Sequence, residues 1–150
     1  MAATWFRSAV RRDDVSTVRL YLMRALYLLN VVLIGSSVWP QVLHHSQSVP
    51  LMEGVAFSFY VALSTLSLFG LRYPLKMLPL LLVQLFYKSA WLLAFVVPLW
   101  LAHALTSELA GALPAMLIGV ILDLVTIPWP YVVANYFLMP GDRWKSISLP

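Results

Sequence analysis

Four long apolar stretches constrain the fold of this chain more than any other feature. They cover residues 20–39, 54–71, 77–102 and 113–138. A helix needs roughly 17–25 mostly apolar residues to cross the hydrocarbon core of a bilayer, and all four stretches are long enough. Because every backbone polar group must be satisfied within lipid, only helices and closed barrels can span it. The stretches lack the polar–apolar alternation of barrel strands, so the sequence predicts four transmembrane helices.

The composition supports this prediction. Of the 150 residues, 61% are hydrophobic and 11% are charged, whereas a soluble domain has about 45–50% and about 25%. The chain is therefore neither an ordinary soluble protein nor a disordered one, because disorder needs low hydrophobicity and high charge. Cysteine is absent, which excludes disulfides, thiol catalysis, iron–sulfur clusters and covalent haem attachment.

The connections between the stretches are short, at 40–52, 72–76 and 103–112. Short connections place neighbouring helices antiparallel. The sequence therefore predicts an all-α, up-down four-helix transmembrane bundle. One membrane domain covers 1–150, with a basic segment at 1–19 and a tail at 139–150. Residues 2–16 fit either a short interfacial helix or a loose tail.

Nine of the ten basic residues fall on one side of the predicted membrane. They are Arg7, Arg11, Arg12, Arg19, Arg24, Arg72, Lys76, Arg143 and Lys145. The excess of Lys and Arg on cytoplasmic loops predicts that both termini are cytoplasmic. It also accounts for the net charge of +4 through topology and lipid headgroups. We therefore expect the lipid bilayer, and not nucleic acid, as the partner of these charges.

Two ionisable residues lie deep within the predicted spans. Lys88 is eleven residues into the third stretch, and Asp123 is about fifteen residues from the end of the fourth. A charge at a helix centre costs roughly 2.5–3.5 kcal/mol on insertion scales, so neither should face lipid. We expect the two side chains to face the interior and to pair. The pair fits either a structural role that sets helix register or an ion or substrate pathway.

Polar and small residues accompany this pair. Gln84 lies one turn before Lys88 on the same helix face. Asn30 and Gln84 are expected to form hydrogen bonds between helices. Two small-residue stripes, at helical spacing, suit close helix packing: Gly54, Ser58, Ala62 and Thr65 in the second span, and Ala115, Gly119 and Asp123 in the fourth.

Pro128 and Pro130 interrupt the fourth stretch. Proline removes a backbone donor and displaces the helix, so we expect a helix break here. Breaks near a buried carboxylate occur at ion sites of transporters, but they also occur as simple kinks.

The histidines raise the question of a metal site. His44, His45, His103 and Glu53 are weak candidate ligands on the outer side. Adjacent His44 and His45 diverge in a helix or strand, and no HxxxH or HExxH spacing exists. Solvated loop histidines are the simpler interpretation, and Glu53 suits the start of a helix. We expect no metal and no cofactor, and the absence of a nucleophile–base arrangement favours a protein that is not an enzyme.

Three motifs carry a resemblance: Arg72-Tyr73-Pro74-Leu75, Pro128-Trp129-Pro130-Tyr131 and Pro140-Gly141-Asp142-Arg143-Trp144. With these motifs in this order, the chain from Tyr21 to Trp144 resembles small four-span proteins of bacterial inner membranes, a group with no assigned activity. In size and layout alone it also resembles the DoxX-like four-helix membrane proteins. The resemblance implies a multi-pass protein of the bacterial inner membrane, and it implies nothing about site residues.

Two functions fit these observations. The first is an accessory or assembly subunit that packs against itself, as a homo-oligomer, or against a larger membrane complex. The small size and the small-residue stripes favour it. The alternative is a small transporter or ion pathway that uses Lys88 and Asp123. Four spans rarely enclose a pathway alone, so this alternative expects an oligomer.

Overall fold

The structure, a computed structural model, describes residues 15–44 and 49–139. These residues form helices and turns without any strand, which confirms the all-α prediction. The described residues divide into a larger compact unit, Thr17–Ile127, and a smaller one that contains residues 128–139. Most of the predicted 2–16 segment lies outside the described residues, as do His45, Arg143, Lys145 and the motif at 140–144.

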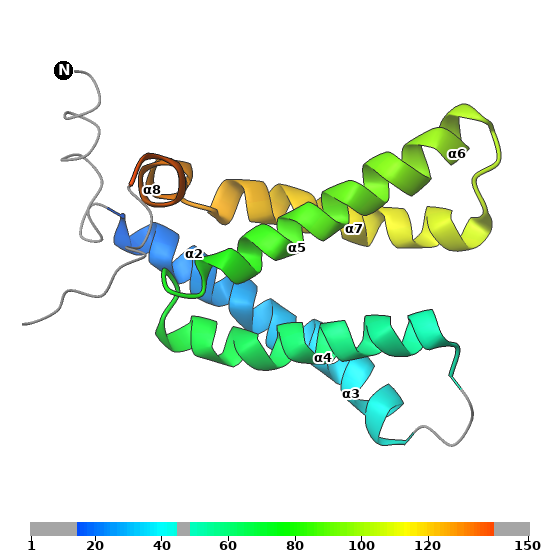
Figure 1. Ribbon diagram of the computed structural model, residues 1–150, viewed down its shortest axis with the longest axis horizontal. Coiled ribbons are helices and arrows are strands. Elements are labelled where there is room, and N and C mark those ends of the chain that lie inside the picture. The colour runs from blue at the N-terminus through cyan, green and yellow to red at the C-terminus, as the bar shows by residue number, and fades with distance from the viewer. Residues whose placement is uncertain (1–14, 45–48, 140–150) are drawn as a thin grey trace, which may run out of the picture. The chain divides into compact units, whose positions relative to one another are not determined.

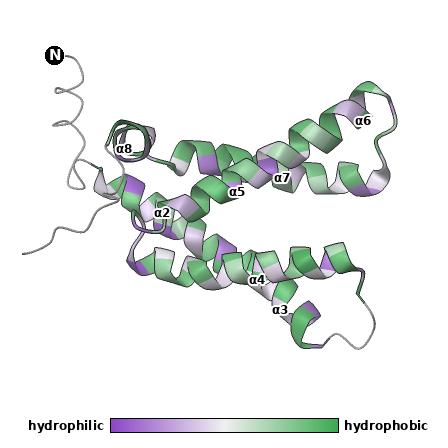
Figure 2. Cartoon of the chain, viewed as in Figure 1, coloured by the Kyte–Doolittle hydropathy of each residue, from purple (hydrophilic) through white to green (hydrophobic). Residues whose placement is uncertain are grey.

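Four helical runs in the larger unit are long and apolar enough to cross a membrane. The first is α2 (Thr17–Leu29), η2 (Asn30–Ile34) and α3 (Gly35–Leu43); the second is α4 (Leu51–Arg72); the third is α5 (Leu78–Trp91), η3 (Leu92–Val96) and α6 (Val97–Leu101); the fourth is α7 (Ser107–Thr126). The η segments are π-helical turns within otherwise continuous helices. Apolar residues dominate the long helices (Figure 2).

The fourth run differs from the predicted 113–138. It begins earlier, at Ser107, where the hydroxyl of Thr106 accepts a hydrogen bond from the Leu109 amide at 3.3 Å and caps the helix. It ends at Thr126, because Ile127 is extended (φ −62°, ψ 126°) immediately before Pro128. After the break, the smaller unit contains α8 (Trp129–Val132) and η4 (Val133–Leu138). Asp123 therefore lies in the last turn of α7.

The four runs form two pairs. Helix α4 packs along α2, η2 and α3, and α7 packs along α5. The pairs contact each other through α2 with α7 and through α4 with α5. Figure 1 shows that α4 and α5 diverge away from the turn at 73–77 that joins them. We call the end of the unit that contains this turn the closed end.

The closed end is densely packed. Tyr27 is fully buried and donates a hydrogen bond from its hydroxyl to the Pro74 carbonyl at 3.1 Å. Its ring lies so close to Gly70 of α4 that a Cβ at position 70 would collide with three ring carbons. Glycine is therefore required at this helix crossing. Met23, Leu78 and other fully buried side chains complete the packing, namely Leu81, Ser67 and Ile127.

Arginines secure the closed end further. Arg24 Nε donates to the Leu71 carbonyl at 3.1 Å, and Arg19 donates to the Val125 carbonyl at 3.4 Å. Both carbonyls lie in the last turn of a helix, where a cation interacts favourably with the helix dipole. Arg72 and Lys76 flank the Tyr73 ring, at 5.5 and 5.2 Å from its centroid. The described basic residues other than Lys88 therefore share the closed end.

Candidate functional site

The predicted pairing of the two intramembrane charges is present. Lys88 Nζ on α5 lies 3.1 Å from Asp123 Oδ2 on α7. The Lys88 side chain is 9% exposed and that of Asp123 is fully buried. Asp123 Oδ1 is buried without a hydrogen-bond partner among the described residues. Burying two charged groups carries a desolvation cost, so a buried ion pair is by itself weak evidence of a stabilising role.

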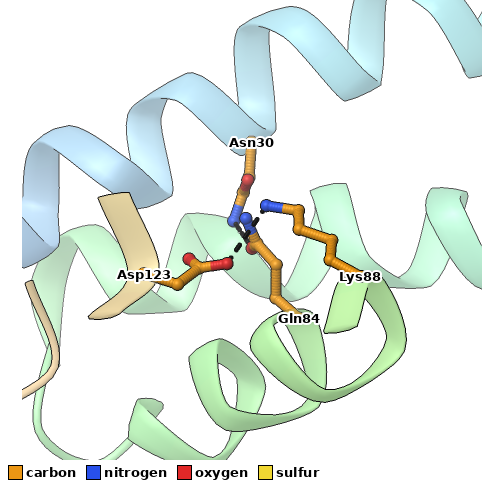
Figure 3. A network of polar contacts seen from close by, with 4 residues as sticks. All are labelled: Asn30, Gln84, Lys88 and Asp123. Atoms are coloured by element: carbon orange, nitrogen blue, oxygen red, sulfur yellow. Dashed lines mark hydrogen bonds and ion pairs between the residues drawn. The ribbon is translucent and has the colours of Figure 1, made fainter. Parts of the chain in front are cut away.

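A second polar contact lies beside the pair. Asn30 Nδ2 donates to Gln84 Oε1, and both residues are almost fully buried. Both amides therefore take part in a hydrogen bond between helices, and each is the other's partner. Figure 3 shows the four side chains converging from α5, α7 and the first run. The site therefore joins three of the four spans.

A π-helical turn begins at Asn30, the residue that the first run contributes to the polar cluster. Asn30 opens η2, and the Leu92 amide that opens η3 donates to the Lys88 and Ser89 carbonyls. π-Helical turns in α-helices occur frequently at functional sites.

Arg24, Tyr27 and Asn30 share one face of the first run, and each forms a hydrogen bond with a different element. This face holds the first run in register against the turn at 73–77 and α5.

A cavity of about 620 Å³ opens at this cluster. Its lining comes from all four spans, and its polar members are Asn30, Ser37, Gln41, Tyr60, Gln84, Tyr87 and Lys88. The other lining residues are apolar or glycine, including Leu29, Phe57 and Met116. Small-molecule sites have this character: about 300–1,000 Å³, mostly apolar, with a few convergent polar groups.

Two tyrosines of the lining were not singled out in the sequence. Tyr60 on α4 and Tyr87 on α5 pack edge to face, with ring centroids 5.9 Å apart. Phe59 contacts both rings in the same geometry. The sequence contained one indication of their role. Tyrosines favour membrane interfaces, whereas these two fall well inside the predicted spans.

Glycine lets Lys88 occupy its position. A Cβ at Gly119 of α7 would lie 2.6 Å from Lys88 Nζ and 3.0 Å from its Cε. Helix α7 packs along α5 at this stripe, and the missing side chain of Gly119 leaves room for the end of Lys88. Ala115 and Gly119 also line the cavity.

The other candidate residues do not join this cluster. His44 is exposed at the end of α3, and Glu53 is exposed in the first turn of α4. His103 is exposed in the turn after α6, with a φ of 52°. Within 15–44 and 49–139, no group of three or more His, Cys, Asp or Glu residues is placed to hold a metal ion.

The predicted helix break at Pro128 is present, and it comes soon after Asp123. The Asp123 carbonyl still accepts a hydrogen bond, from the Ile127 amide at 3.0 Å. Pro130 lies in the first turn of α8, where its missing N–H costs nothing. The break ends α7 one turn after Asp123.

The fold and the site together define the class. The chain is a multi-pass membrane protein with an all-α helical bundle and a polar cluster inside its spans. No protein-family model, curated protein or solved structure matches it.

Proposed function

We propose that the protein binds one small molecule between its two helix pairs, with the Lys88–Asp123 pair at the site. The observation that carries the proposal is the cavity of about 620 Å³, whose polar lining residues include Asn30, Gln84 and Lys88. Buried charges are costly in a membrane and mark functional sites by default. This proposal shares its site with the transport alternative, which adds a further step to binding.

Binding is tested with four probes that share a dodecyl chain and differ in the head: dodecane, methyl dodecanoate, dodecanoate and dodecylamine. The protein is placed in lipid nanodiscs, and native mass spectrometry counts the probe molecules retained per chain. We expect at least one probe to be retained at one copy per chain. Failure to retain any of the four contradicts the proposal.

Two matched variants locate the bound probe. Ala115 lines the cavity and is exposed, so Ala115→Phe fills the cavity without disturbing the buried core. Ala110 is exposed on the same helix and lies outside the lining, so Ala110→Phe is the control. We expect Ala115→Phe to abolish retention and Ala110→Phe to preserve it. Equal retention in both variants contradicts the proposed location.

Transport is the further step that the site permits. If Lys88 and Asp123 carry a proton or cation, Asp123→Asn should leave expression intact and abolish a proton- or cation-linked flux in proteoliposomes. Equal flux in wild type and variant contradicts transport by this pair. Binding of a probe would still stand, because the two assays measure different steps.

A second candidate is the accessory or assembly subunit. The stripe on α4 favours it, because Ser58, Ala62 and Thr65 are exposed and nothing lies within 4 Å of a Cβ at Gly54. Small residues let another helix approach closely in lipid. A second copy of the chain, or a helix of a larger complex, would pack on this stripe.

The absence of native cysteine makes the second candidate testable. Ser58→Cys places one thiol on the stripe, and Val83→Cys places one on an exposed position of α5. Oxidation in native membranes should yield a cross-linked species for Ser58→Cys and none for Val83→Cys. Equal cross-linking contradicts a specific contact at the stripe.

A further inference from the structure

We propose that the cavity takes a neutral amphipathic molecule whose head carries a hydrogen-bond acceptor oxygen, a carbonyl or an ester, and whose body is hydrocarbon. This inference rests on the proposed binding function and specifies the class of ligand. It follows from which polar groups line the cavity and which lie behind the lining.

Donor groups line the cavity. Lys88 lines it, and its ammonium group has three N–H donors, of which Asp123 Oδ2 accepts one. Gln84 also lines it, and because its oxygen accepts from Asn30, its amide nitrogen remains a donor for a further partner. Asp123 is fully buried and is not part of the lining. An acceptor oxygen is therefore complementary to the part of the wall that Lys88 and Gln84 form.

The charges of Lys88 and Asp123 favour a ligand whose polar group is neutral. Lys88 and Asp123 together carry no net charge, so a bound anion or cation would add an uncompensated charge within the membrane span, which is costly. A cation would also meet the ammonium of Lys88 before any carboxylate, because none of the residues that line the cavity is acidic. A carbonyl oxygen gains the hydrogen bond to a charged donor without this cost.

The apolar lining and the volume of the cavity determine which hydrocarbon part the ligand can have. Leucine, isoleucine, valine, phenylalanine and methionine side chains make up most of the remaining lining. The volume of about 620 Å³ suits a small molecule. A transmembrane helix, ~10 Å across and ~30 Å long, occupies on the order of 2,000 Å³ and would not fit. The occupant is therefore a single hydrocarbon chain or compact apolar group with one polar head.

The dodecyl series tests the head directly, because the four probes share the same body. We expect methyl dodecanoate to bind on the order of tenfold or more tighter than dodecane, as one hydrogen bond to a charged donor allows. Dodecanoate and dodecylamine should bind more weakly than the ester. Tighter binding of the acid or the amine overturns the inference and leaves the proposed binding function intact. Absence of binding by all four overturns both.

Substitutions at two glycines test whether Lys88 causes the preference for the ester over the alkane. Gly119→Ala would displace the Lys88 ammonium and keep its charge, whereas nothing lies within 4 Å of a Cβ at Gly111 on the same helix. We expect Gly119→Ala to reduce the ester-to-alkane affinity ratio severalfold and Gly111→Ala to leave it unchanged. An unchanged ratio in both variants overturns the role of Lys88. The wild-type ranking still decides the head class if Gly119→Ala fails to fold.

Discussion

An added Cβ would collide with a large side chain at two glycines of the Thr17–Ile127 unit, and the two contacts differ in how far that side chain can move. At the closed end, Gly70 faces the ring of Tyr27, which is fully buried and held by its hydroxyl. At the cavity, Gly119 faces the flexible end of Lys88. The Tyr27 ring is enclosed by the packed core, so Gly70 is needed for helix packing. The end of Lys88 borders the cavity, so Gly119 is needed to accommodate a residue of the site.

The largest expected effect comes from breaking the ion pair. Lys88→Met removes the ion-pair partner of the fully buried Asp123 carboxyl group, and we expect a loss of up to about 3–5 kcal/mol in the free energy of unfolding. The double variant Lys88→Met/Asp123→Leu should recover most of that loss, because no buried charge remains. Unfolding by denaturing detergent in mixed micelles measures both.

The control for this prediction is Lys76→Met at the closed end. Lys76 is exposed beside Tyr73, so its removal should change the free energy of unfolding by less than about 1 kcal/mol. If Lys88→Met is as mild as Lys76→Met, the ion pair is not buried in the membrane-embedded protein and the comparison fails.

The next largest effect is expected at the rigid glycine. Gly70→Ala places a Cβ against three carbons of the Tyr27 ring, and overpacking of this kind costs about 1–3 kcal/mol. The same assay measures it. Gly54→Ala is the control on the same helix, because nothing lies within 4 Å of that Cβ. It should be neutral or slightly stabilising, since alanine reduces the entropy of the unfolded chain. Equal effects at 54 and 70 would contradict the close crossing.

A smaller loss is expected when Tyr27 keeps its ring and loses its hydroxyl. Tyr27→Phe leaves the buried Pro74 carbonyl without this donor, which costs on the order of 1 kcal/mol. Tyr21→Phe, at a position that is 64% exposed, should change nothing measurable. Indistinguishable unfolding of the two variants would mean that packing alone holds the closed end.

The smallest stability effect is expected at the second glycine. Gly119→Ala displaces only the end of a flexible side chain, so we expect a change below about 1 kcal/mol. A double-mutant cycle on Lys88 and Asp123 in this background should show a reduced coupling energy. A loss as large as that of Gly70→Ala would show that the Lys88 contact is as rigid as the Tyr27 contact.

Much of this architecture could be predicted from the sequence. The four helices follow from the length and composition of the apolar stretches, because a bilayer sets a minimum helix length. The pairing of Lys88 with Asp123 follows from the cost of exposing charges to lipid. The sequence also marks Asn30 and Gln84 as groups that form hydrogen bonds between helices, and the structure shows that they bond to each other. The helix break at Pro128 follows from the missing donor of proline.

Local pattern did not predict where the fourth helix ends or what the small residues contact. The apolar stretch continues past Pro128, so composition alone extended the span to residue 138, whereas Ile127 ends α7. The Ala115–Gly119 stripe faces a cavity, and the Gly54–Ser58 stripe faces away from the described helices. A small residue permits close approach but does not specify what approaches.

The sequence by itself determined the number of spans, their apolar character and the need to bury two charges together, because these depend on the solvent that surrounds each helix. Only the tertiary structure decided that the two helix pairs diverge, that Tyr60 and Tyr87 line a cavity, and that Gly119 accommodates Lys88. These features depend on which helix faces meet and at what distance. Residues far apart in the sequence set both, through contacts such as Tyr27 with Gly70.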